Sequence, residues 1–340
     1  MTDAIYMKRC LELAKLGLGR TKTNPLVGCV IVHQNNIIAE GYHSAFGKPH
    51  AEVEAFNKVK DKSILKECAV YVNLEPCSFV GKTPACAALF EANPCKRLIV
   101  GMLDPNPRVA GKGIERLRKA GIETTLSVLE EQCQHLNKAF IKSIHAQQPY
   151  VIAKWAQSDD GFIGSTNERV MISNDLVNTV SQKWRAEIDA YLIGNNTLRI
   201  DQPRLDLREF QGNQPLRCIL GNSIDLNNPF FENETPGILF THQHPNQLPS
   251  HFKAKDISNP LGILKYLYQE NVGTLMIEGG RQTIQSFLHL DLVDELRIIT
   301  NHALKLQQGI SAPELPDDLF FLEAQEFYRD NSINYFQRIP

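Results

Sequence analysis

The chain has 340 residues, of which 43% are hydrophobic and 22% are charged, a balance that is normal for a globular protein with room for two domains. The formal net charge of −2 gives no bulk attraction to nucleic acid or to an anionic membrane, so neither is expected as a partner. No run of about 18 apolar residues is present, so no transmembrane helix is expected.

The first residues, MTDAIYMKRCLELAKLGLG, interleave charged and apolar side chains at helical spacing. This pattern favours an amphipathic helix over a secretory signal, and we therefore expect a cytoplasmic protein. The eight cysteines are then expected to stay reduced, because disulfides are rare in a reducing compartment.

The next 130 residues alternate strand and helix patterns, which is typical of a three-layer α/β domain. The patterns predict strands at 26–32, 36–42, 68–74 and 96–102, and helices at 50–59, 84–92, 111–121 and 129–145. A polar run followed by Pro149 ends the last of these helices. We place a domain boundary there, with one domain over residues 1–146 and a second over residues 150–340.

The second part of the chain repeats this alternation and predicts another α/β domain. Its expected strands are 150–156, 189–194, 216–221, 237–240, 274–280 and 295–300, and its expected helices are 174–188, 260–271 and 281–290. The stretches 201–215 and 222–258 are rich in Pro, Asn and Asp, which favours loops. The final residues, SINYFQRI, alternate in the manner of an edge strand.

One histidine and two cysteines in the first domain indicate a catalytic metal site. His50 lies two residues before Glu52 at a predicted helix start, and Cys77 and Cys86 follow nine positions apart. Both cysteines are expected at helix starts, where the helix dipole favours the thiolate. One imidazole and two thiolates leave one position of a tetrahedral zinc open, as in catalytic zinc sites.

Such a site suits hydrolytic removal of an amino group from an aromatic ring. Zinc lowers the pKa of water to about 7, and Glu52 is then free to carry protons to the ring nitrogen and to the departing ammonia. Zinc deaminases of nucleobases carry the same His-x-Glu, Pro-Cys and Cys signature. A single histidine near a helix start is usually an ordinary surface or core residue, but the two cysteines on separate segments favour zinc.

The sequence resembles the bifunctional deaminase/reductase family of riboflavin biosynthesis. The stretches that carry the resemblance in the first domain are KTNPLVGCVIV, EGYHSAFGKPHAEV, YVNLEPCSFVGKTPAC, DPNPRVAGKGIERLRKAGI and LNKAF. Those in the second are VIAKWAQSDDGFIG, KWRAEIDAYLIGNNTLRID, RLDLR and IEGG. Eight residues separate Cys77 from Cys86, where most zinc deaminases have two, and this spacing is similar to that of the same family.

The resemblance implies a cytidine-deaminase-like N-terminal domain and a C-terminal α/β domain similar to dihydrofolate reductase. It implies that the first deaminates diaminohydroxyphosphoribosylaminopyrimidine, with zinc on His50, Cys77 and Cys86 and with Glu52 as the catalytic residue. The second would use NADPH to reduce the ribosyl chain of 5-amino-6-(5-phosphoribosylamino)uracil to ribityl. Family members often form homo-oligomers, and this stays an open expectation for the present chain.

Further site residues follow from the resemblance. Substrate contacts are expected from Asn24, Lys154, Arg169, Arg185, Leu205, Arg208 and Glu278, and cofactor contacts from Ala156, Met171, Thr197, Asp201, Gly279, Gly280 and Arg281. Physical arguments support part of this set, because a glycine pair before a helix lets backbone N–H groups approach a phosphate and a guanidinium binds phosphate with two hydrogen bonds. Without the resemblance, Arg185 equally fits an exposed helix charge, Glu278 a solvent-exposed strand end, and Asn24 a turn residue before a proline.

Several residues depart from the family pattern, and three of these departures bear most on the two sites. Phe79 stands where the family has a histidine, Arg169 where it has a serine and Met171 where it has a tryptophan. The first change is expected to weaken substrate binding and the other two to weaken NADPH binding. Two alternatives therefore stay open: only one of the two sites is active, or the first domain deaminates another nucleotide beside a repurposed second domain. A non-catalytic binding module is disfavoured because Glu52 is present.

Overall fold

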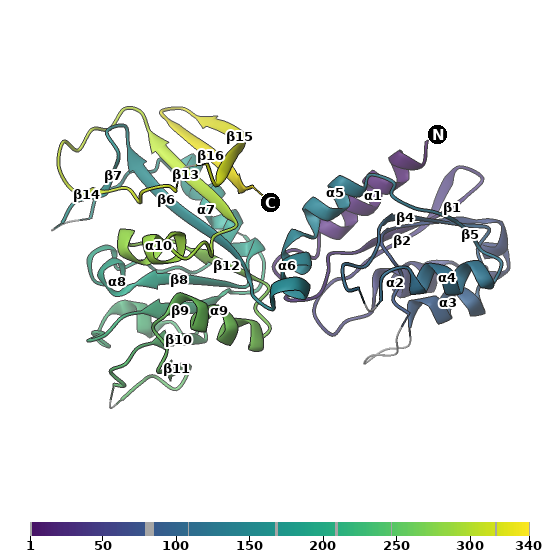
Figure 1. Ribbon diagram of the computed structural model, residues 1–340, viewed down its shortest axis with the longest axis horizontal. Helices are drawn as coiled ribbons and strands as arrows, with labels where there is room; N and C mark the ends of the chain where they lie inside the picture. Colours follow the sequence, from purple (N-terminus) through teal and green to yellow (C-terminus); the bar gives the residue numbers. More distant parts are fainter. Residues whose placement is uncertain are drawn as a thin grey trace. The chain divides into compact units, whose positions relative to one another are not determined.

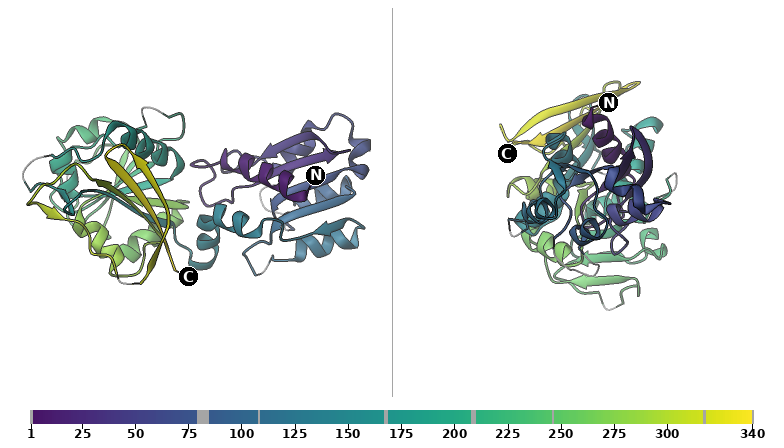
Figure 2. Two further views of the ribbon diagram at one scale, coloured as in Figure 1. Left: turned by 90° about the horizontal axis from the view of Figure 1, so that it is seen from above. Right: turned by 90° about the vertical axis from the view of Figure 1, so that its right-hand side faces the viewer.

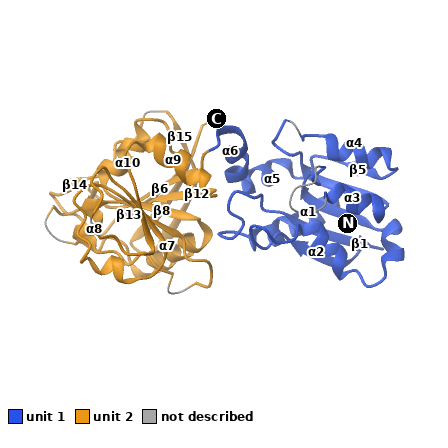
Figure 3. Ribbon diagram, turned by 90° about the horizontal axis from the view of Figure 1, so that it is seen from below, with its two compact units in different colours: residues 1–147 blue, residues 148–340 orange. Residues whose placement is uncertain are grey.

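The computed structural model describes residues 2–78, 85–107, 109–166, 169–207, 210–245, 247–316 and 318–339. The chain divides into two compact units, Met1–Gln147 and Gln148–Pro340 (Figure 3). Each unit has its own sheet and its own hydrophobic core. Within the described ranges, no helix has the length and apolar character that crossing a bilayer requires.

Unit 1 is built on a five-stranded sheet in the order β2-β1-β3-β4-β5, counted over the described residues. The strands are β1 (Gly28–His33), β2 (Asn36–Tyr42), β3 (Ala69–Leu74), β4 (Arg97–Met102) and β5 (Glu123–Thr125). β1 runs antiparallel to both β2 and β3, whereas β3, β4 and β5 are parallel. The short turn between β1 and β2 holds Gln34 and Asn35 at positive φ.

Helices cover both faces of this sheet. They are α1 (Asp3–Lys15), α2 (Ala51–Lys58), α3 (Cys86–Ala92), α4 (Lys112–Lys119), α5 (Glu130–Leu136) and α6 (Lys138–Ala146), with a 3-10 turn, η1, at Lys62–Glu67. Figure 1 shows α1 and α5 over one face and α2, α3 and α4 over the other. β1, β3 and β4 are therefore buried on both faces, which explains why their sequences are continuous apolar runs.

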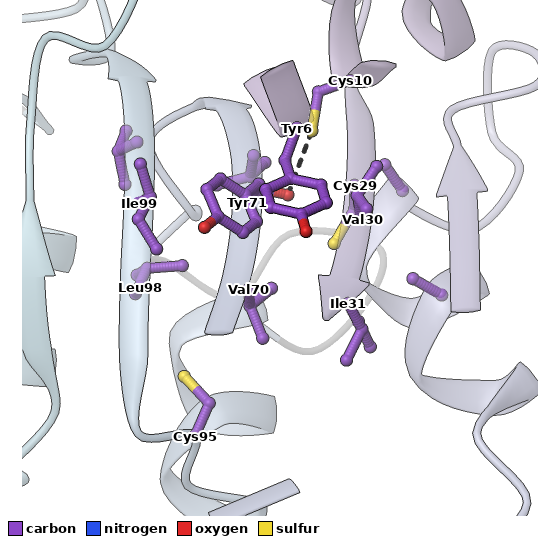
Figure 4. Close-up of a cluster of buried hydrophobic side chains, with 14 of the residues drawn as sticks. Tyr6, Cys10, Cys29, Val30, Ile31, Val70, Tyr71, Cys95, Leu98 and Ile99 are labelled. Carbon is purple, nitrogen blue, oxygen red and sulfur yellow. Dashed lines mark hydrogen bonds between the residues drawn. The ribbon is translucent and has the colours of Figure 1, made fainter. Parts of the chain in front are cut away.

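The core of unit 1 joins α1 to the central strands. In Figure 4 the ring of Tyr6 lies against that of Tyr71, with centroids 4.9 Å apart, and the Cys10 thiol donates to the Tyr71 carbonyl at 3.4 Å. Gly28 lies under the same helix, and a Cβ at this position would lie 2.1 Å from the Cys10 carbonyl oxygen. This close approach fixes the start of β1 and the loop before it.

Unit 2 is built on a nine-stranded sheet, again counted over the described residues, in the order β11-β10-β9-β8-β12-β6-β13-β16-β15. The strands are β6 (Tyr150–Ser158), β8 (Ala190–Gly194), β9 (Leu216–Leu220), β10 (Gly237–Phe240), β11 (Phe252–Lys255), β12 (Thr274–Ile277), β13 (Glu295–Asn301), β15 (Phe320–Tyr328) and β16 (Asn331–Arg338). β11 through β13 in this order are all parallel, and the C-terminal hairpin adds two antiparallel strands. β7 (Phe162–Gly164) and β14 (Ile310–Ser311) form a separate small pair.

The helices of unit 2 are α7 (Asp175–Glu187), α8 (Asn195–Asp201), α9 (Pro260–Gln269) and α10 (Arg281–Leu288), with a 3-10 turn, η2, at Pro229–Glu232. Figure 3 shows α9 and α10 on one side of the sheet and α7 on the other, whereas α8 follows the end of β8. Strands that alternate with helices in this way form the mixed α/β layers expected from the sequence.

Three expectations about the elements are wrong. The helix predicted over 129–145 is two helices, which meet at Asn137 because its buried side chain hydrogen-bonds the Leu26 backbone. SINYFQRI is not an edge strand: β16 lies between β13 and β15. The actual edge, β15, is exposed along most of both faces, so its sequence carries no burial period. The loop expected over 222–258 also contains β11.

Candidate active sites

The three predicted zinc ligands of unit 1 lie together. His50 caps the N-terminus of α2, Cys86 is the first residue of α3, and Cys77 lies in the segment after β3. The His50 Nδ1 atom is 3.2 Å from the Cys86 Sγ and 3.7 Å from the Cys77 Sγ, and all three ligand atoms lie within 4.8 Å of one another. One nitrogen and two sulfurs at this spacing fit the donor set of a zinc ion.

Cys77 is not at a helix start, which corrects the prediction for this residue. Its sulfur nevertheless accepts the backbone N–H of Cys86, at 3.2 Å, from the first turn of α3. Hydrogen bonds from Cys86 and His50 lower the pKa of the Cys77 thiol to about 4. The hydrogen bond to Cys77 and burial raise the pKa of Cys86.

Glu52 lies beside these ligands with only 3% of its surface exposed. It is on the first turn of α2, two residues after His50. Burial raises the pKa of the Glu52 carboxyl, against the opposing effects of its own backbone N–H and of His50. A carboxyl group with a raised pKa next to a metal site is suited to accept and to release protons near neutral pH.

Asn24 and His43 border the same site. The Asn24 Nδ2 atom lies 3.1 Å from the His43 Nε2 atom, and the His43 ring meets the His50 ring edge to face with centroids 5.7 Å apart. The backbone after Asn24 is held by two buried asparagines: Asn73 Nδ2 and Asn137 Nδ2 both donate to the Leu26 carbonyl, at 2.9 and 3.1 Å. The sequence analysis identified neither asparagine, because each acts on a segment more than 40 residues away.

Glu75 is another residue that the sequence analysis missed. Its buried carboxylate accepts four backbone N–H groups, those of Asp104, Gly111, Gly113 and Ile114, at 2.9 to 3.3 Å. Glu75 precedes the zinc-ligand segment by two residues, so it ties that segment to the loop after β4 and to the start of α4. The only feature of the sequence that could have pointed to Glu75 is its place within the family motif LEPCS, which comes before the motif DPNP.

Unit 2 contains a cleft of about 990 Å³ near the ends of β8 and β12. It is lined by most of the residues predicted for the reductase site, namely Lys154, Ala156, Arg169, Met171, Arg185, Thr197, Asp201, Leu205, Glu278, Gly279, Gly280 and Arg281. Ligands of open α/β sheets bind at this end of the strands. Two further residues of the sequence analysis, Arg208 and Phe79, lie outside the described residues.

Charged side chains inside the cleft form an ion-paired group. Arg185 donates from Nε and Nη2 to the two carboxylate oxygens of Glu278, at 2.9 and 2.6 Å, and the two side chains are 13% and 5% exposed. The interpretations of Arg185 as an exposed helix charge and of Glu278 as a solvent-exposed carboxylate are therefore wrong. Burial disfavours charge on Glu278, but Arg185 and Lys154 hold its pKa below the usual range. Burial lowers the pKa of Lys154.

The glycine pair adjoins this group. Gly280 has φ +73°, which favours glycine, and a Cβ on Gly279 would lie 3.1 Å from the Thr197 methyl group. Gly280 caps the N-terminus of α10, as a phosphate site requires. The guanidinium of Arg281 is already paired with Glu314, at 2.6 Å, so a phosphate would share or replace this contact.

Arg169, Met171 and Asp201 line the remainder of the cleft. Burial raises the pKa of Asp201, and the charge of Arg169 opposes the shift. Met171 is 61% exposed, so the side chain that stands where the family has tryptophan packs against little of the protein. Leu205 is buried and at positive φ, and the Tyr191 hydroxyl donates to its carbonyl oxygen.

Comparisons with known proteins agree with this division of sites. The family model of the cytidine and deoxycytidylate deaminase zinc-binding region matches residues 1–102, and that of the RibD C-terminal domain matches residues 149–303. The riboflavin biosynthesis protein RibD of Aquifex aeolicus is 37% identical over 326 residues, covering 92% of this chain and 90% of the relative. RibD of Synechocystis is 35% identical and covers 96% of this chain and 91% of the relative.

Solved structures give the same result. The crystal structure of a diaminohydroxyphosphoribosylaminopyrimidine deaminase/5-amino-6-(5-phosphoribosylamino)uracil reductase from Thermotoga maritima superposes with a TM-score of 0.91 at 33% identity. The match covers 99% of this chain and 98% of that chain. A crystal structure of Acinetobacter baumannii RibD matches with a TM-score of 0.89 at 29% identity and covers 99% of both chains.

Proposed function

We propose that this chain, which belongs to the RibD family of riboflavin biosynthesis proteins, performs the two family reactions at the two sites described above. The chain is a bifunctional deaminase and reductase that uses zinc and NADPH. We further propose which residues carry out catalysis and binding, and that the substrate is a phosphoribosylated pyrimidine. One observation carries the proposal: His50, Cys77, Cys86 and a buried Glu52 meet at one point of unit 1.

In unit 1, diaminohydroxyphosphoribosylaminopyrimidine loses an amino group to water and gains a carbonyl oxygen. His50, Cys77 and Cys86 would hold zinc, and the bound metal would supply the Lewis acidity that makes water nucleophilic at neutral pH. Glu52 accepts the proton that water releases and passes it to the ring nitrogen, and then moves the proton of the new hydroxyl group to the amino group, which departs as ammonia and leaves the carbonyl. Its raised pKa suits a group that must take and give the same proton.

In unit 2, the ribosyl ring of the deaminated nucleotide opens and its first carbon is reduced. The cleft would hold NADPH, which would supply the hydride. Gly279 and Gly280 leave space for a phosphate at the start of α10, and the Arg185–Glu278 pair forms one wall of the cleft. Lys154 lies near both charges, and in its protonated form it can give a proton to the ring oxygen as the ring opens. These are the roles that the charges and the shape of the cleft support best.

Two separate assays test this assignment. Ammonia release from the diaminopyrimidine nucleotide by the zinc-loaded protein reports unit 1, and NADPH oxidation with the deaminated nucleotide reports unit 2. Both activities are expected. Absence of one activity would favour a chain in which a single site works, and the assay that fails would identify the inactive unit.

We also expect a homo-oligomer in the cytoplasm, since members of the family often associate. Sedimentation of the purified protein and fractionation of the producing cells test these two expectations. A purely monomeric species at micromolar concentration would contradict the first, and recovery of the protein in an envelope fraction would contradict the second.

A further inference from the structure

His43 lies between the candidate zinc site and the loop that carries Asn24, and the mechanism above gives it no task. Its side chain is almost fully buried, at 3% exposure. It packs edge to face against His50 but is not one of the three clustered ligands. A buried imidazole next to a catalytic site, with partners on both nitrogens, calls for a physical explanation.

The two hydrogen bonds of His43 fix its tautomer. The Nδ1 atom lies 3.0 Å from the Pro49 carbonyl oxygen, and because a carbonyl oxygen only accepts, Nδ1 must carry the hydrogen. On the other side of the ring the Asn24 Nδ2 atom, which can only donate, lies 3.1 Å from Nε2, so the two neighbours together fit a neutral ring with its hydrogen on Nδ1. In a neutral imidazole with hydrogen on Nδ1, the Nε2 atom is an acceptor.

This acceptor determines how the Asn24 amide is oriented. The Asn24 Nδ2 group donates to the His43 Nε2 atom at 3.1 Å, and the opposite orientation would bring two acceptors together. The Asn24 Oδ1 atom therefore points away from His43, and within the described part of the chain no hydrogen bond to it is found. The backbone cannot compensate for a flipped amide, since Asn73 and Asn137 hold Leu26 two residues later.

We propose that His43 is a positioning residue that makes Asn24 present a hydrogen-bond acceptor, and not its NH₂ group, to the pyrimidine. The inference rests on the proposed deaminase function of unit 1. It follows that the loop that carries Asn24 recognises an edge of the pyrimidine ring that carries an N–H donor. A ring edge with a carbonyl group at the same place would meet the Asn24 oxygen and be rejected.

Two substitutions at His43 separate its two hydrogen bonds. Asparagine places its NH₂ near the position of Nδ1 and keeps the bond to Pro49, but has no group at the position of Nε2. Glutamine reaches the position of Nε2 and keeps an acceptor for Asn24. We expect His43→Asn to raise the KM for ammonia release at least about tenfold, the effect of losing one well-placed hydrogen bond. His43→Gln should recover most of that loss, with equal zinc content and equal Tm in both variants.

A double-mutant cycle with Asn24→Ala tests whether His43 acts through Asn24. Once the amide is removed, His43→Asn should change KM no further. An equal loss in His43→Asn and His43→Gln, or an undiminished effect of His43→Asn in the Asn24→Ala background, would overturn the proposal.

Nitrogen-15 NMR of the zinc-loaded protein tests the tautomer without relying on activity. We expect the hydrogen of His43 on Nδ1. If the wild type releases no ammonia but the hydrogen is on Nδ1, the deaminase assignment fails while the orientation of Asn24 stands. A hydrogen on Nε2 would refute the His43 proposal, whatever the activity.

Discussion

Arg185 and Glu278 face each other across 93 positions of the sequence and form a two-point ion pair inside the cleft of unit 2. Both side chains were expected to contact the substrate, and the structure shows that they are paired with each other. Pairing of this kind aligns the guanidinium plane with the carboxylate and leaves the remaining donors of Arg185 in a fixed direction. The part of the cleft where we propose that the substrate binds is therefore preorganised by this ion pair.

Replacing Arg185 by lysine should weaken both folding and reduction, because an ammonium cannot make the two parallel hydrogen bonds. We expect the free energy of unfolding to fall by about 2 kcal/mol, the value of hydrogen bonds to a buried charged group. Urea unfolding and NADPH oxidation with the deaminated nucleotide measure the two effects. Arg116→Lys is the matched control, since Arg116 makes the same two-point contact with Glu91 on the surface. An equal loss of stability in both variants would contradict the account.

The reductase should lose activity at high pH, and the loss should begin at a lower pH than the pKa of an ordinary lysine side chain would give. Burial lowers the pKa of Lys154 below the usual value of about 10.4. Protonated Lys154 is the active form, so kcat/KM should be constant at low pH and fall as the pH passes through the lowered pKa. Lys154→Arg stays protonated but is a poor proton donor, so it should lower kcat/KM at every pH and remove this alkaline limb. A limb that is unchanged in Lys154→Arg would exclude Lys154 as its origin.

The carboxylate of Glu75 should be needed both for the stability of unit 1 and for the retention of zinc by the segment that carries Cys77. In Glu75→Gln, an NH₂ group faces backbone donors that the carboxylate oxygen accepts in the wild type. We expect a loss of about 2 kcal/mol in the free energy of unfolding of unit 1 and weaker zinc retention. Denaturant unfolding and zinc analysis after dialysis measure these effects. Glu115→Gln changes an exposed residue of α4 and should leave both unchanged.

Removal of zinc should abolish deamination and leave reduction intact, since the three clustered ligands all belong to unit 1. Treatment with a chelator, followed by the two separate assays, tests this directly. Cys77→Ser should have the same selective effect. Cys68→Ser is the control, because Cys68 is outside the ligand cluster and its thiol donates to the Ile64 carbonyl, a bond that serine can keep. Loss of reduction on zinc removal would contradict the separation of the two sites.

The sequence predicted the parts of the fold that depend on local patterns. Strands such as β3 and β4 are continuous apolar runs because helices cover both of their faces. The cluster of candidate zinc ligands was predictable because His50 and Glu52 share one helical turn and the spacing of Cys77 and Cys86 is similar to that of the family. In each of these cases the pattern that carries the prediction lies within one short stretch of sequence.

Contacts between distant segments were not predictable in the same way. Nothing near Glu75 shows that its carboxylate meets a helix start 36 residues later, and nothing near Asn137 shows that its amide holds Leu26. The edge strand β15 was missed because both of its faces are largely exposed, so burial imposes no alternation on its sequence. Cys77 was wrongly placed on a helix because its sulfur, not its backbone, lies at the start of α3.

We propose that one chain deaminates and then reduces the same nucleotide. The most direct test is NADPH consumption by the zinc-loaded protein when only the undeaminated diaminopyrimidine nucleotide is supplied. The account predicts oxidation of NADPH by the wild type and by Glu54→Gln, a control on the same helix, and none by Glu52→Gln. Glu52→Gln should recover NADPH oxidation when the deaminated nucleotide is added. Oxidation of NADPH by Glu52→Gln from the undeaminated nucleotide at the wild-type rate would contradict the account.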